Sequence, residues 1–178
     1  MQVALDQSNS DLSLDTLTNA CENSIDDCQL ILEQINDVMY TYRVENHSSV
    51  GAHIRHILER FNCFFDGHPQ QLIDYDNRKR DRNLEASLVN AKHALAGFSS
   101  SLNKVRSSKL TAVSVSESVD DNHPPVVVQS TIERELMELV SHTTHHLAII
   151  VMLVNAQGGS LPVELGKAPS TLIFENRQ

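Results

Sequence analysis

The sequence predicts an all-α protein, an up-and-down four-helix bundle with a small β-hairpin between helices 3 and 4 and an irregular C-terminal tail. In four long segments, apolar residues recur at three- and four-residue steps, the spacing that places side chains on one face of a helix. Between the third and fourth segments the spacing changes to two, which is typical of strands. A chain of 178 residues has the length of one domain, so we expect residues 1–178 to fold as a single unit.

The first helix is expected from about Ser13 to Tyr42. Its apolar residues repeat every seven positions, and a second series fills the alternate steps, as in the seam of a long bundle helix. The two series are Leu14, Cys21, Cys28, Ile35 and Tyr42, and Leu17, Ile25, Leu32 and Met39. The chain has three cysteines and no C-x-x-C pair, so we expect Cys21 and Cys28 to fill the core rather than to form a disulfide framework.

The second and third helices are separated by a polar stretch. Ser48 or Ser49 can cap the second helix, which should end at about Asp66, before a Gly-x-Pro sequence. The polar residues 67–83 are interpreted as a loop. The third helix is expected over about 84–105, where seven apolar residues face one side: Leu84, Leu88, Ala91, Leu95, Phe98, Leu102 and Val105.

The fourth helix, Ser130 to Gln157, is the most apolar of the four. Ser130 and Glu133 form a capping-box pattern at its start, and a Gly-Gly pair follows its end. Before it, alternating residues at 111–116 and a valine run at 126–128 predict the hairpin. The tail after residue 159 has no helical period, so we expect it to wrap irregularly along the bundle.

The composition excludes several classes of partner. With 14 Lys+Arg against 23 Asp+Glu the net charge is −9, and no basic stripe is present that could neutralise phosphates, so nucleic acid is not an expected partner. The N-terminus lacks the basic and apolar regions of a secretory signal. The longest apolar run, 147–154, is shorter than the roughly 20 residues that span a bilayer. We therefore expect a cytoplasmic protein without membrane contact.

Histidines are concentrated in the second and fourth predicted helices. His142 and His146 are four residues apart, so on a helix they stand one above the other and can reach a single divalent ion. His145 lies about 60° away from His142 around the helix axis, so it does not share this alignment. A third imidazole, from His53 or His56, would leave coordination positions open, as in catalytic zinc sites, and would also suit nickel, iron or copper. Spacing alone does not decide between His53 and His56. It also does not decide whether the histidines are metal ligands or side chains packed in the core.

Four segments resemble, in order, the DinB-like family of metal-binding four-helix bundles, and together they cover nearly the whole chain. They are SVGAHIRH at 49–56, IDYDNRKRD at 73–81, STIERELMELVSHTTHH at 130–146 and GKAPSTL at 166–172. The H-x-x-x-H in the third of these is the most specific part. In that family, one histidine seven residues after the serine that begins the second helix joins both histidines of this motif.

The resemblance thus implies a site in which His56, His142 and His146 hold one divalent transition metal, zinc or nickel. His53 and His145 become neighbours that either orient a ligand by hydrogen bonding or simply pack beside it. The 73–81 segment could reach over the open end of the site. Its candidates for a catalytic role are Tyr75, Arg78 and Arg80, and the alternative is that Asp74 and the arginines form surface ion pairs that hold the loop.

Related bundles include transferases of low-molecular-weight thiols, and others look like hydrolases. The resemblance therefore implies a metal-dependent enzyme with a small-molecule substrate, and we expect thiol transfer to an electrophile rather than hydrolysis. The alternative is a non-catalytic metal-binding or structural dimeric bundle of the stress-response type. A homodimer is expected in either case, because related bundles pair and residues 147–152 leave little polar surface on the fourth helix.

Overall fold

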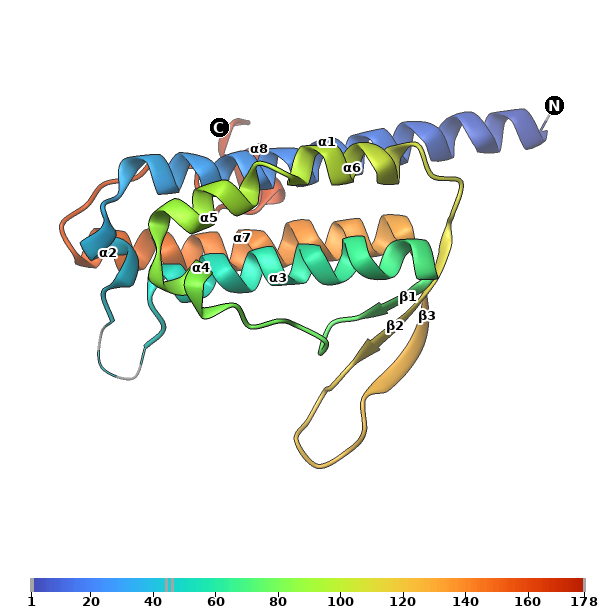
Figure 1. The fold of residues 1–178 in the computed structure, drawn as a ribbon. Coiled ribbons are helices and arrows are strands. Elements are labelled where there is room, and N and C mark those ends of the chain that lie inside the picture. The colour runs from blue at the N-terminus through green and yellow to red at the C-terminus, as the bar shows by residue number, and fades with distance from the viewer. Residues whose placement is uncertain (1, 44, 46, 178) are drawn as a thin grey trace.

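The computed structural model describes residues 2–43, 45 and 47–177 and is mostly helical, with a small three-stranded sheet at one end. In Figure 1, α1 (Gln2–Gln34) lies with α5 (Leu88–Leu95) and α6 (Phe98–Arg106), and α3 (Val50–Gly67) lies beside α7 (Ile132–Ala156). Contacts of α1 with α7 and of α3 with α5 join these two groups. The helical prediction is right for most of the chain, but it misses part of the sheet.

The first predicted helix is in fact two helices. α1 begins at Gln2, before the predicted start, and ends at Gln34, before the predicted end. α2 (Asp37–Thr41) begins after Asn36, whose side chain accepts a hydrogen bond from the Met39 N–H. Because the chain turns here, Tyr42 is 51% exposed and does not continue the predicted seam. Tyr40 is buried instead, and its hydroxyl donates a hydrogen bond to the main-chain carbonyl of Leu84 in α4 (Arg82–Ala86).

The second helix begins at the predicted cap, and a missed strand follows it. The Ser49 side chain accepts a 3.1 Å hydrogen bond from the Ala52 N–H at the start of α3. The segment predicted as a loop contains a short 3₁₀ helix, η1 (His68–Gln70), and a strand, β1 (Leu72–Asp74). β1 pairs in parallel with β2 (Ala112–Glu117), a partner about 40 residues away for which local sequence gives no signal.

The third predicted helix is interrupted twice, giving α4 (Arg82–Ala86), α5 and α6. Ser87 has an extended backbone, and its side chain caps α5 by accepting a hydrogen bond from the Asn90 N–H. Gly97 separates α5 from α6. The predicted apolar stripe still faces the core, since the breaks preserve its phase. Its buried members are Leu88, Ala91, Leu95, Phe98, Leu102 and Val105.

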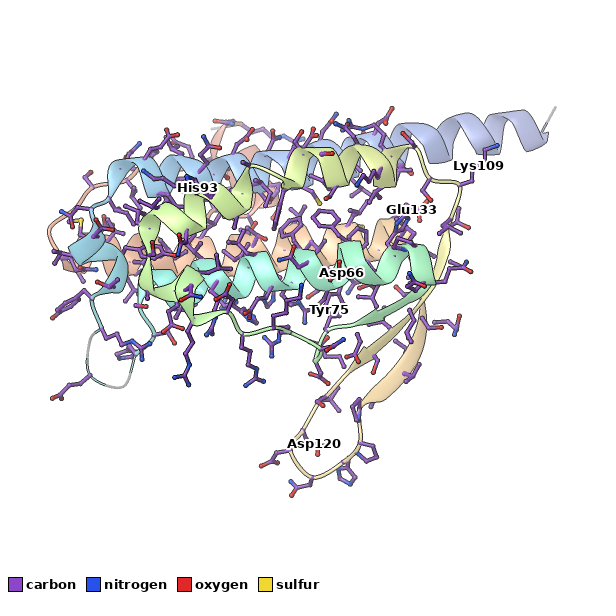
Figure 2. The ribbon with its side chains drawn as sticks, viewed as in Figure 1. Asp66, Tyr75, His93, Lys109, Asp120 and Glu133 are labelled. Atoms are coloured by element: carbon purple, nitrogen blue, oxygen red, sulfur yellow. The ribbon has the colours of Figure 1, made fainter. Side chains whose placement is uncertain are left out.

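The sheet has the order β1-β2-β3, with β3 (Val126–Thr131) antiparallel to β2 at its edge. Val113 and Val115 of β2 point into the core, whereas the valines at 126–128 are exposed. Figure 2 shows Asp120 at the tip of the β2–β3 connection, away from the helices. The strands expected at 111–116 and 126–128 thus belong to a three-stranded sheet rather than to a hairpin alone.

α7 begins at Ile132, slightly later than the predicted start at Ser130. Thr131 is its N-cap and accepts a hydrogen bond from the Arg134 N–H, whereas Ser130 is still paired with β2 and donates to Glu135. The predicted Ser130–Glu133 capping box is therefore wrong. Within the described residues, α7 is also the one helix whose length and apolar composition would let it cross a bilayer, a property that core helices of soluble proteins share. Sequence reasoning missed this property because it considered only the uninterrupted apolar run 147–154. The apolar character of α7 extends beyond that run, on the other side of His and Thr residues.

The tail after α7 is partly helical and lies against the bundle. Leu161 and Leu165 are buried, and α8 (Pro169–Glu175) follows, where an irregular segment was predicted. Gly166 has a φ of +76°, and a Cβ built on it would lie 2.4 Å from the Ala148 main-chain nitrogen. Only glycine accommodates both conditions, so this residue sets how closely the tail approaches α7.

Candidate metal centre

His56 of α3 and His142 and His146 of α7 come together where the two helices pack side by side. One ring nitrogen of each lies within 4.8 Å of the others. The Nε2 atoms of His56 and His142 are 2.9 Å apart, and the ring centroids of His56 and His146 are 4.8 Å apart. Spacing left both His53 and His56 open as the third histidine. The structure groups His56, which the resemblance selects, with His142 and His146.

Local packing fixes where these side chains point. On α7, Thr143, Leu147 and Ile150 are buried, and His142 and His146 lie at the edge of the face they form. On α3, a similar buried face includes Ile54, Ile57, Leu58 and Phe61, and His56 lies beside it. The histidines are therefore half-buried at the margin of the core.

The donor set fits a divalent transition metal. Three neutral imidazoles are ligands for zinc, nickel, iron or copper, and they leave coordination positions open. Nitrogens bound to one tetrahedral ion at about 2.0–2.1 Å lie about 3.3 Å apart, and ring nitrogens within 4.8 Å of one another lie near this spacing. The metal itself is not identified by this donor set.

Burial and mutual repulsion keep these histidines neutral. Burial, with added repulsion from His142 and Arg78, lowers the pKa of His56 to about 3. Burial and Arg60 lower the pKa of His142 to about 4, and burial with His142 and His56 lowers the pKa of His146 to about 3. Neutral imidazole is the form that binds a metal, so at neutral pH these rings do not have to lose a proton before a metal binds.

The two neighbouring histidines occupy different places. The Nδ1 atom of His53 lies 2.9 Å from Nδ1 of His146, so this residue can orient the His146 ring through a hydrogen bond. His145 is exposed, and its ring lies edge-on to that of His146, with 5.2 Å between the centroids. The structure thus gives His53 a hydrogen-bonding contact and His145 a packing contact.

The three candidates in the 73–81 segment also differ in position. Arg78 is half-buried and its Nη1 lies 2.7 Å from Nδ1 of His56. Tyr75 is 1% exposed and lies below α3 in Figure 2, where its hydroxyl donates a 2.9 Å hydrogen bond to Glu135. Arg80 is exposed, with a φ of +49°. Among the described residues, neither Arg78 nor Arg80 forms an ion pair. The segment is held instead by a hydrogen bond that the Asp81 N–H donates to the Glu59 carboxylate.

Sequence reasoning missed the buried charges beside the histidines. The Arg60 guanidinium lies over the Tyr75 ring, 3.7 Å from its centroid, and forms ion pairs with Glu117 and Glu138. Arg60 is four residues after His56, and Glu138 is four before His142, so both lie one turn along the same helix faces. That i, i+4 spacing is the signal that could have identified them.

Comparison with models of protein families, with curated proteins and with solved structures finds no match.

Proposed function

We propose that this chain is a DinB-like four-helix bundle that binds one divalent transition metal, zinc or nickel, through His56, His142 and His146. The proposed bundle consists of α1, α3, the α4–α6 series and α7. The convergence of three ring nitrogens within 4.8 Å, from two helices that are far apart in sequence, is the observation that carries this proposal. The motifs quoted above support the family, and the neutral state of the histidines supports metal binding.

For the reaction, we propose transfer of a low-molecular-weight thiol to an electrophilic small molecule. When bound, a divalent metal would supply a Lewis acid that favours thiolate at neutral pH. The chain supplies the surroundings: His53 orients His146, and the Arg78 guanidinium places a positive charge beside the histidine group. A metal-dependent hydrolase would use the same residues, and the choice between the two reactions rests on the family resemblance.

A second candidate is a non-catalytic metal-binding bundle. The observation that favours it is a fourth imidazole beside the group, since Nδ1 of His53 lies 2.9 Å from Nδ1 of His146, and a fourth ligand would close the coordination shell. Both candidates are proposed as cytoplasmic proteins. Both are also proposed as homodimers, since Met137 and Met152 expose apolar surface on α7. Light scattering that finds a monomer at micromolar concentration would remove the dimer.

Metal content per chain tests the proposal directly. Untagged protein incubated with zinc or nickel should contain about one equivalent, and His142→Ala/His146→Ala should contain none. The matched control is His93→Ala/His123→Ala, which removes two exposed histidines and should keep the metal. Cobalt spectra then separate the candidates, because an open site responds to an added thiol and a closed site does not. Equal metal content in all three proteins would overturn the assignment.

A further inference from the structure

A cavity of about 310 Å³ lies between α3 and the segment that connects β1 to α4. Its lining consists of four arginines and one glutamate, Arg55, Arg78, Arg80, Arg82 and Glu59. In Figure 1 this segment runs along α3 on the side away from α1. The volume is within the range of about 300–1,000 Å³ that small-molecule pockets occupy.

The positive charge of this cavity is only partly compensated. Arg55 pairs with Glu85 at 2.8 Å and with Glu59 at 3.8 Å. Arg80 and Arg82 are exposed, and neither forms an ion pair with a residue that the structure describes. On a chain with a net charge of −9, this is a local concentration of unpaired cations.

Arg78 connects the cavity to the histidine group. Its Nη1 contacts His56, while its Nε is buried without a hydrogen-bond partner among the described residues. The Nε of Arg55 also has no hydrogen bond among the described residues, although it lies 3.8 Å from Oε2 of Glu59. A guanidinium is planar and presents its donors as a fork, so the arginines that line this cavity are suited to bidentate binding of a planar or tetrahedral oxyanion.

We propose that this cavity binds the oxyanion of a small-molecule substrate, a carboxylate or a phosphate, and that Arg78 positions the bound molecule beside the histidine group. The role of the ligand as a substrate rests on the proposed function, whereas binding of the oxyanion does not require the metal. Arg80 and Arg82 supply the attraction from the open side. The carboxylate or phosphate thus marks one end of the substrate, and its reactive group lies toward His56.

Calorimetric titration of the full-length, metal-free protein tests the oxyanion site. The probes are succinate and inorganic phosphate, with succinamide as the uncharged analogue of succinate. The protein should bind at least one anion and should not bind succinamide, and the preferred anion identifies the substrate class. In Arg80→Gln/Arg82→Gln this anion should bind about tenfold more weakly, because two charge-assisted contacts are lost.

The matched control is Lys104→Gln/Lys109→Gln, which makes the same change in net charge on α6 and the segment after it. Its anion affinity should stay within about twofold of the parent. Equal weakening in both double variants, or no anion binding by the parent, would overturn the inference. If the arginine double variant does not fold, Arg80→Gln is compared with Lys104→Gln, each of which removes one charge from an exposed side chain.

Zinc content of each protein separates the two proposals. Loss of anion binding in Arg80→Gln/Arg82→Gln with about one zinc retained supports the cavity and leaves the histidine site intact. A parent that binds the anion but no zinc keeps the oxyanion site and overturns the metal proposal. A parent that binds zinc but neither anion does the reverse.

Discussion

The Arg78 guanidinium contacts the His56 ring, with Nη1 2.7 Å from Nδ1. Arginine has donors and no acceptor, so Nδ1 of His56 accepts this hydrogen bond. In a neutral ring the proton then lies on Nε2 and is donated to Nε2 of His142, 2.9 Å away. While both contacts are in place, His56 has no lone pair for a metal, so metal binding must displace Arg78.

Arg78→Gln should therefore bind zinc more tightly than the parent, by about tenfold or more, because a positive charge beside the divalent ion is removed and Nδ1 of His56 can carry the proton. Competition with a chromophoric chelator measures this affinity. Arg177→Gln, which removes an exposed arginine in the C-terminal tail, should leave it unchanged. Weaker zinc binding in Arg78→Gln would mean that Arg78 supports the site instead of competing with the metal.

The histidine group should make the metal-free protein less stable as the pH falls. The pKa values of His56 and His142 are lowered to about 3 and about 4, mainly by burial, whereas an unfolded histidine titrates near 6.5. Between these values the unfolded chain binds more protons, so the free energy of unfolding decreases as the pH falls from about 7 to about 4. Near pH 5, each of the two histidines contributes about one proton to this difference.

Urea unfolding in the presence of a chelator, at pH 7 and pH 5, checks this dependence. His56→Gln/His142→Gln should lose less stability than the parent over this interval. His47→Gln/His93→Gln, which replaces two exposed histidines, should show the parental slope. Identical slopes in all three proteins would show that the group is not held neutral.

The Tyr75 hydroxyl should contribute to the stability of the fold, because it is buried and hydrogen-bonded. It donates to Glu135, which is also buried, and Ser130 donates to the other oxygen of that carboxylate. Tyr75→Phe leaves the carboxylate with one fewer donor, so the free energy of unfolding at pH 7 should fall by about 1–3 kcal/mol. Urea unfolding measures this loss, and Tyr42→Phe at an exposed tyrosine should change stability little. An equally small effect in Tyr75→Phe would contradict the buried hydrogen bond.

Periodicity predicted the helices well because each one has a single core-facing stripe. Leu88, Leu95 and Leu102 are buried as expected, although two breaks divide the segment. The breaks themselves escaped prediction because Asn36 and Ser87 can either cap a helix or sit within one, and tertiary packing decides between these roles.

The histidine site was partly predictable for the same reason. His142 and His146 share a helix face by spacing alone, but the choice of His56 required the family motif. The strand β1 and the contact of Arg78 with His56 depend on the path of the segment between α3 and α4, and no local pattern encodes that path. The oxyanion cavity follows from this path as well, so it was not foreseeable.

The last prediction concerns the docking of the tail on α7. Gly166 has a φ of +76°, and an added Cβ would lie 2.4 Å from the Ala148 main-chain nitrogen. Gly166→Ala must therefore strain the backbone and push the tail outward, at a cost of about 1–3 kcal/mol. Leu161 and Leu165 would lose part of their burial. The free energy of unfolding should fall accordingly, and limited proteolysis should cut the tail faster than in the parent.

Gly97→Ala is the matched control, because a Cβ at this position would meet nothing within 4 Å and the backbone is already in the right-handed helical region. Alanine restricts the unfolded chain more than glycine does, so this variant should be as stable as the parent or more stable by up to about 1 kcal/mol. Opposite signs in the two glycine variants would show that close approach and positive φ decide the effect. A stable, protease-resistant Gly166→Ala would mean that the tail does not need this contact to stay on α7.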